Sequence, residues 1–279
     1  MARLGLGVTG LAAVLAGAAL SVAPVRAGPI PLASYRAIYD LALDDTAKES
    51  DVGNLAGRLV TEFTGSECAG YKAKLRFVTS MDNSDGQQEV TDSRSTTFEA
   101  GDGHHFTFTN ETYSNEGLVE QSVGTADRSA GGVAVALTKP DRKHFGLAVG
   151  VAFPTEQIAK VLDAARAGEK FVSIDVYDGS EDGQTVFATA AVIGPGSSAP
   201  DDVGDEKAIA DAGISGLRHW PVTISYFDKK KGGESTPFYV MSFVVYEDGV
   251  GRKLKIDYGD FAISGKLTGL QILPADPCP

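Results

Sequence analysis

Alternation between apolar and polar side chains runs through most of this sequence and limits the folds that it can adopt. The clearest case is 71–79, where apolar residues fall on one face and the cations Lys72, Lys74 and Arg76 on the other. Successive side chains of a strand point to opposite faces of a sheet, so this pattern predicts a half-buried antiparallel strand. Similar segments, separated by turns rich in Gly and Asp, recur at 35–43, 55–63, 89–99, 105–113, 117–124, 132–138, 170–177, 185–193, 217–227, 238–246, 253–258 and 261–273.

These segments predict a mostly β fold. About 12 to 14 strands exceed what a flat open sheet usually holds, so we expect one large antiparallel sheet, curled to cover its own apolar face. Residues 195–211 are rich in Pro, Gly, Ser and Asp and are predicted to form an exposed, mobile loop. No internal repeat or domain boundary is evident, so residues 28–279 are predicted to form one domain.

One segment, 155–167, has the period of a helix instead. Pro154 precedes it and Gly168 follows it, as at the two ends of many helices. This is the one main helix that we predict, and it should plug or flank the concave side of the sheet. Its apolar positions lie on one face: Ile158, Val161, Leu162 and Ala165.

Residues 1–27 have the three parts of a secretory signal peptide. Arg3 supplies the positive start, residues 4–20 are mostly Leu, Val, Ala and Gly, and Val25-Arg26-Ala27 matches a signal-peptidase site. The alternative is an uncleaved membrane anchor, which the shortness of the apolar stretch disfavours. We therefore expect cleavage after Ala27 and a mature chain that works outside the cytoplasm.

The charge balance limits the partners of the mature chain. The sequence has a formal net charge of −12 at pH 7, with 37 acidic and 25 basic residues. Such a surface repels nucleic acids in general, so no nucleic-acid partner is expected. No later stretch is apolar and long enough to cross a bilayer, and the mature chain is predicted to be soluble.

The two cysteines, Cys68 and Cys278, are predicted to form a disulfide. An exported chain with two cysteines usually pairs them because its compartment is oxidising. Such a bond would tie the C-terminal tail to an early turn and would stabilise the fold by about 5 kcal/mol on chain-entropy arithmetic. Two free thiols or a nucleophilic Cys68 are the alternatives, and Glu67 beside Cys68 does not favour a thiolate.

Possible metal ligands do not form a recognisable set. His104 and His105 are adjacent in a predicted strand and should point to opposite faces. Residues 178–183 read D-x-S-x-D-G, like the start of a calcium loop, but Thr189 stands where an EF-hand has its bidentate Glu. We therefore predict a hairpin turn at 178–183 and no metal site.

The remaining polar residues are predicted to be structural or solvated. His219 beside Trp220 looks structural, and the residues around His144 read as a basic hairpin. The sequence has no nucleophile elbow, zinc-protease motif or phosphate loop, so no catalytic residue and no cofactor are predicted. An acidic loop is predicted to be solvated, and it contains Asp201, Asp202, Asp205 and Glu206.

Several short motifs together resemble the EipB family, cell-envelope integrity proteins of α-proteobacteria long described as a domain of unknown function. The resemblance covers nearly the whole mature chain, and its motifs are mostly structural. They are 35–41 (YRAIYDL), 67–71 (ECAGY), 153–157 (FPTEQ), 220–222 (WPV), 238–243 (FYVMSF), 246–249 (YEDG) and Cys278.

The resemblance implies a periplasmic protein of Gram-negative cells, folded as a β-spiral with one disulfide and needed for envelope integrity under stress. It brings no catalytic residues. Our first hypothesis is a non-enzymatic protein that binds an envelope protein or lipid through its curved sheet. The alternatives are a lipid or lipoprotein carrier, which needs a continuously apolar concave face, and an envelope-polymer hydrolase using carboxylates such as Asp40 and Asp44.

Overall fold

The computed structural model describes residues 31–47, 50–83, 85–231 and 236–278, so the predicted signal peptide lies outside the described residues. Each predicted strand coincides with an observed one to within a few residues, and 143–147, which we predicted within a basic hairpin, forms one more strand. The strands are β1 (Tyr35–Thr46), β2 (Val52–Ser66), β3 (Gly70–Asn83), β4 (Gln88–Glu99), β5 (His105–Ser114), β6 (Gly117–Ser129), β7 (Gly132–Lys139), β8 (Lys143–Leu147), β9 (Phe171–Val176), β10 (Phe187–Ile193), β11 (His219–Asp228), β12 (Tyr239–Tyr246), β13 (Gly251–Asp257) and β14 (Phe261–Ile272).

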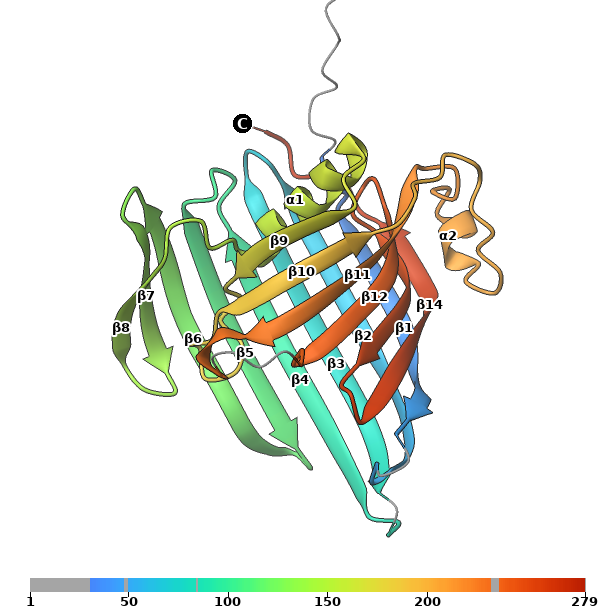
Figure 1. Cartoon of the computed structure of the whole chain (residues 1–279), viewed down its shortest axis with the longest axis horizontal. Coiled ribbons are helices and arrows are strands. Elements are labelled where there is room, and N and C mark those ends of the chain that lie inside the picture. The colour runs from blue at the N-terminus through green and yellow to red at the C-terminus, as the bar shows by residue number, and fades with distance from the viewer. Residues whose placement is uncertain (1–30, 48–49, 84, 232–235, 279) are drawn as a thin grey trace, which may run out of the picture.

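All of these strands belong to one 14-stranded sheet, which confirms the mostly β prediction. The sheet has the order β8-β7-β6-β5-β4-β3-β2-β1-β14-β13-β12-β11-β10-β9, and each pair of neighbours is antiparallel. The first strand therefore lies in the middle, paired with both β2 and β14, and the two edges are β8 and β9. Figure 1 shows the sheet curled into an open, barrel-like spiral. We call β1–β8 the N-terminal wall and β9–β14 the C-terminal wall.

Helix α1 (Pro154–Ala167) connects the two edge strands and confirms the predicted helix. Its N-terminus has no cap on its own chain segment; instead the buried Glu99 of β4 accepts hydrogen bonds from the backbone N–H groups of Thr155 at 2.6 Å and Glu156 at 3.3 Å. Gly168 ends the helix with a left-handed φ of 79°. The helix lies between the walls at one end of the spiral, which it closes (Figure 1).

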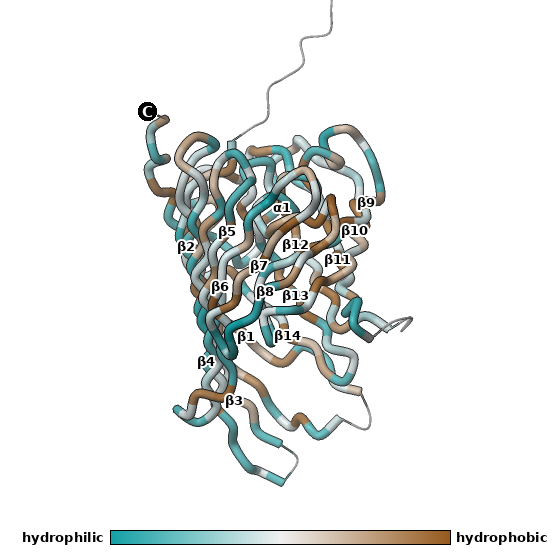
Figure 2. The backbone as a smooth tube through the Cα atoms, turned by 90° about the vertical axis from the view of Figure 1, so that its left-hand side faces the viewer, coloured by the Kyte–Doolittle hydropathy of each residue, from teal (hydrophilic) through white to brown (hydrophobic). Residues whose placement is uncertain are grey.

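The apolar core follows the curl of the sheet. One cluster packs α1 against β9–β12, with Leu162 and Trp220 almost fully buried. A second joins β1, β2 and β14, and a third joins β5–β7 to Tyr177 just after β9. Figure 2 shows the hydrophobic colour concentrated along β9–β12, whereas β4 is largely hydrophilic.

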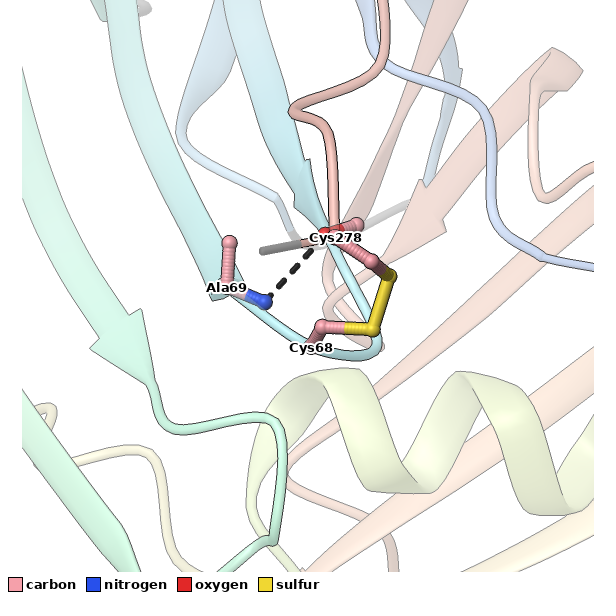
Figure 3. The surroundings of a disulfide bond; sticks show 4 residues. Cys68, Ala69 and Cys278 are labelled. Carbon is pink, nitrogen blue, oxygen red and sulfur yellow. Dashed lines mark hydrogen bonds between the residues drawn. A yellow bond between two sulfur atoms is a disulfide. The ribbon is translucent and has the colours of Figure 1, made fainter.

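The disulfide between Cys68 and Cys278 joins the turn after β2 to the C-terminal tail (Figure 3). The two Cα atoms are 5.2 Å apart and the residues are separated by 210 positions in the sequence. Because the tail follows β14, the bond fastens the end of one wall to a turn of the other.

The segment between β10 and β11 differs from the mobile loop predicted for 195–211. It contains a short helix, α2 (Ala208–Asp211), and it buries Ile209 and Ile214 in the second core cluster. The Pro, Gly and Asp residues correctly predict an irregular backbone for this segment. It is nevertheless anchored to the sheet, because Ile209 in α2 and Ile214 just after it are buried in that cluster.

Candidate functional site

The inner face of the curled sheet (Figure 1) is partly polar along the N-terminal wall. Residues paired directly in an antiparallel ladder point to the same face. Ser95 is paired with Leu75 on one side and Asn110 on the other, and Ser93 with Phe77 and Thr112. Because Phe77 packs into the second core cluster, this row of hydroxyl and amide groups faces inward.

The C-terminal wall presents an apolar and aromatic row to the same interior. Tyr239, Met241 and Phe243 of β12 are half-buried and pack against the cluster around α1. The Tyr239 ring stacks on that of Tyr226, with 4.4 Å between ring centroids. The interior is therefore apolar on one side and polar on the other, and it is not lined continuously by apolar side chains.

The connection from β9 to β10 enters the interior over β5 and β6. Gly179 has a left-handed φ of 70°, and a Cβ there would lie 2.4 Å from the Phe108 ring, so only glycine fits this close approach. Its carbonyl accepts hydrogen bonds from the Asn110 amide at 2.9 Å and from the Ser122 hydroxyl. The spiral is thus partly filled on this side by its own chain.

Residues 178–183 form the predicted hairpin turn. Asp178 accepts the backbone N–H of Ser180 at 2.9 Å, and Asp182 accepts that of Gln184 at 2.9 Å and the Lys230 ammonium at 2.8 Å. The two carboxylates therefore accept hydrogen bonds from backbone N–H groups of the turn and from a neighbouring lysine. Among the described residues no group of three or more His, Cys, Asp or Glu side chains is arranged to hold a metal ion.

The pKa values of two partly covered glutamates near this turn, Glu120 and Glu181, are raised. Partial burial, together with the charge of Asp182, raises the pKa of Glu120. Burial and the charges of Glu120 and Asp178 raise the pKa of Glu181. In each case burial and the negative charge of neighbouring carboxylates favour the protonated form.

The carboxylates that we considered for a hydrolase lie elsewhere and are paired. Asp40 forms a salt bridge with Arg58 at 2.7 Å, and Asp44 forms one with Lys255 at 2.6 Å. Both pairs are largely exposed to solvent, and the two carboxylates do not converge on one cleft. His104 and His105 are also separated, since His105 contacts Asp127 and His104 contacts the Arg128 carbonyl.

The acidic loop is buried in part, so the prediction that it is solvated is wrong for two of its members. Arg252, with 1% of its surface exposed, donates hydrogen bonds to Asp201 at 2.7 Å and to Glu206 at 3.0 Å. Tyr246 donates to the same Asp201 oxygen at 2.6 Å, and a His219 ring nitrogen lies 3.8 Å from Asp201. This cluster fastens the 201–206 segment to β12 and β13.

The electrostatics of this cluster follow from its pairing. Burial acts to raise the pKa of Asp201, but the hydrogen bonds from Arg252 and Tyr246 outweigh it and hold the pKa below its usual range. Glu206 also accepts the backbone N–H of Leu267 at 2.9 Å, so both carboxylates are fully engaged. We missed the cluster because Arg252 and its partners are about 50 residues apart and no local pattern links them.

The geometry defines a class before any comparison: a barrel-like protein made of one curled antiparallel sheet, closed at one end by a helix and held by one disulfide. The chain matches the EipB-like family over residues 26–274, and it belongs to that family. It is 41% identical to the cell envelope integrity protein EipB of Brucella abortus over 257 residues, which are 92% of this chain and 88% of the relative.

A solved structure agrees with the fold. The crystal structure of a β-barrel-like protein of domain of unknown function DUF1849 from Brucella abortus matches with a TM-score of 0.80 and 40% identity. The match covers 87% of this chain and 99% of that chain. Within the described residues, no helix has the length and apolar character needed to cross a bilayer.

Proposed function

We propose that this chain is a non-enzymatic periplasmic protein that supports the integrity of the cell envelope. The observation that carries the proposal is its 41% identity to a Brucella abortus protein named for that role, over 92% of the chain. The signal peptide predicted for 1–27 supports export, and a Cys68–Cys278 disulfide suits an oxidising compartment.

The interior of the spiral is the surface through which we propose that it binds an envelope component. A segment of a partner protein fits this interior better than an acyl chain does. Covering a hydroxyl group such as that of Ser95 with an apolar ligand costs free energy, because an acyl chain offers no hydrogen bond in exchange for those made to water. A peptide offers backbone groups to the polar wall and apolar side chains to Met241 and Phe243.

A carrier of lipid or lipoprotein is the second candidate. The row Tyr239, Met241 and Phe243 favours it, because these half-buried side chains could extend the core around an acyl chain. The polar row of β4 and β5 argues against it, since such a carrier needs an apolar face on both sides. A hydrolase has less support, because Asp40 and Asp44 each have a basic partner.

A complementation experiment tests the proposal. The gene is deleted from its host, and survival is measured under detergent and cell-wall antibiotic challenge after return of the wild type, Leu75→Glu or Lys72→Glu. Leu75 faces the interior and is 38% exposed, whereas Lys72 is exposed on the opposite face of the same strand. We expect Leu75→Glu to accumulate normally and fail to restore survival, and Lys72→Glu to restore it.

Three results would contradict parts of this proposal. Full rescue by Leu75→Glu would show that the function does not need the interior. Recovery of the mature chain outside the periplasmic fraction would contradict the proposed location. Mass spectrometry of material that co-purifies with the wild-type protein separates the candidates, because a stoichiometric lipid would favour the carrier and a stoichiometric protein the binding role.

A further inference from the structure

The two edges of the sheet are protected very differently. Natural sheets guard exposed edges with charged residues, because an open edge pairs with other chains. The β8 edge follows this rule, since Lys143 and His144 are exposed along it. The β9 edge does not: Phe171 and Val192, which are paired across β9 and β10, are each 56% exposed.

The backbone of β9 offers hydrogen-bonding groups on its open side. The Ile193 N–H donates to the Lys170 carbonyl at 2.9 Å, which sets the alternation of the ladder between β9 and β10. By this alternation the N–H and C=O groups of Phe171 and Ser173 point away from β10. Among the described residues, no strand pairs with β9 on that side at these two positions.

A short piece of the chain already occupies the far end of this edge. The Ala152 N–H donates to the Asp175 carbonyl at 2.8 Å, and the Tyr177 N–H donates to the Ala152 carbonyl at 2.9 Å. Ala152 and Val176 thus form a parallel bridge. Gly150 has a left-handed φ of 90°, and among the described residues no backbone hydrogen bond joins the chain before Ala152 to Phe171 or Ser173.

A groove of about 740 Å³ runs along this open part of the edge. One side of it is β9 from Val172 to Asp175, and the other is the exposed face of α1 with Lys160, Asp163 and Ala167. Val149, which is 71% exposed, also lines the groove. The volume is within the range of ordinary ligand sites, and the edge has room for about four residues of extended chain.

We propose that the open edge of β9 and this groove bind an extended, basic segment of a partner protein, which adds to the sheet as a further strand. The groove is lined by none of the residues through which we propose that the interior binds, so the inference does not depend on what the interior binds. Main-chain hydrogen bonds to Phe171 and Ser173 would supply affinity, and contacts with the exposed Phe171, Val192 and Val149 side chains would supply selectivity.

Charge complementarity points to a basic segment and argues against a second copy of this chain. The groove has one cation, Lys160, and three carboxylates, those of Asp163, Glu169 and Asp175. Asp163, Asp175 and Lys160 have ionic partners in Arg166, Lys229 and Glu156, so among the described residues the carboxylate of Glu169 is the charge of this lining that no salt bridge neutralises. The whole chain has a formal net charge of −12, so two copies repel each other and a cationic segment is attracted.

Selection from a phage library of random dodecapeptides on the immobilised mature protein, residues 28–279, tests the proposal. We expect enriched peptides to alternate apolar residues with Lys or Arg, and to slow hydrogen exchange at the amides of Phe171 and Ser173. Ser173→Pro removes an outward N–H and blocks pairing, and Phe171→Lys places a cation against the ligand. Each should weaken binding of an enriched synthetic peptide by about tenfold or more.

The control is Leu118→Lys, which changes an apolar side chain that is 51% exposed on β6 and should leave binding unchanged. If Ser173→Pro unfolds, Phe171→Lys carries the test alone, because its side chain is exposed. Equal binding by both variants and the wild type would overturn the proposal, as would failure to enrich any peptide. A wild-type dimer that Ser173→Pro converts to a monomer would also overturn it, since the edge would then be covered by a second copy.

Discussion

The two walls of the spiral are built from the same kind of ladder but are stabilised differently. The C-terminal wall buries large side chains against α1 and encloses a cation, Arg252, with two carboxylates. The N-terminal wall has longer strands whose outer faces carry ion pairs with a solvent-exposed cation, such as Arg76 with Asp92 at 2.9 Å. We therefore expect similar side chains to contribute different free energies of unfolding in the two walls.

The largest effect should come from removing the buried guanidinium. Arg252→Met leaves Asp201 and Glu206 as buried, uncompensated carboxylates, which typically costs about 3–5 kcal/mol. Arg76→Met removes a guanidinium that also has carboxylate contact but has 57% of its side chain exposed. We expect its unfolding midpoint to stay close to that of the wild type. Urea unfolding of both variants measures the difference, and similar losses would erase the contrast between the walls.

A second matched pair compares a leucine of α1, which packs against the C-terminal wall, with a leucine of the N-terminal wall. Leu162 of α1 is 0% exposed, and Leu162→Ala should cost about 2–5 kcal/mol through lost burial and a residual cavity. Leu75 of β3 is 38% exposed, and Leu75→Ala should cost less than about 1 kcal/mol. Thermal and urea unfolding report both values. An equal cost would mean that the interior beside β3 is more tightly packed than its exposure indicates.

The disulfide joins the two walls, and its loss should affect both together. Cys278→Ser is expected to lower the free energy of unfolding by about 2–4 kcal/mol, because the unlinked unfolded chain gains entropy. Spectroscopic probes placed in each wall should report the same decrease in the free energy of unfolding. Unchanged gel mobility of the exported wild type with and without reductant, with two alkylatable thiols, would show that the bond is not formed in cells.

The smallest effects should be those of pH, with opposite signs for two carboxylates. Hydrogen bonds from Arg76 and Arg94 lower the pKa of Asp92 to about 2, so its contribution is present above the unfolded pKa and is lost as pH falls toward 2. Burial raises the pKa of Glu99, so its contribution is present at low pH and is lost as pH rises through the folded pKa.

Stability curves of Asp92→Asn and Glu99→Gln against pH separate these two contributions. The first should differ from the wild type above about pH 4 and converge with it toward pH 2. For Glu99→Gln, the free energy of unfolding should decline less steeply than that of the wild type as pH rises above the ordinary pKa of a glutamate. NMR titration of the two carboxyl groups gives the midpoints directly, and a Glu99 midpoint below its usual range would reverse our sign.

The sequence was sufficient for what depends on local pattern. The alternation in 71–79 and the helical spacing from Ile158 to Ala165 each depend on neighbours a few residues away, and both predictions are confirmed. The family resemblance implied a β-spiral, but the strand order, with β1 paired to β14, was not predicted, because pairing between distant strands leaves no local pattern. Strand β8 was missed because its short run KHFGL carries two exposed polar residues and too few apolar ones to alternate visibly.

The errors concern contacts between distant segments. Asp201 and Glu206 look like members of a solvated loop until Arg252 is placed beside them. Likewise, Glu99 is an ordinary strand residue in the sequence and becomes the cap of α1 only in the fold. A buried ion pair leaves no periodic signal, so local reasoning cannot find it.

The position of β1 in the middle of the sheet has a consequence for how the fold is completed. A chain made from its N-terminus can form β1 to β8 hairpin by hairpin, which needs only local contacts. The second edge of β1, however, pairs with β14, and Tyr35 meets Ile272 only when synthesis is nearly finished. Until then this edge is an open template for aggregation, and closing it is a slow, long-range step. The first strand to be synthesised therefore completes its pairing only with the last, so we expect β1 to need protection from aggregation until β14 is available.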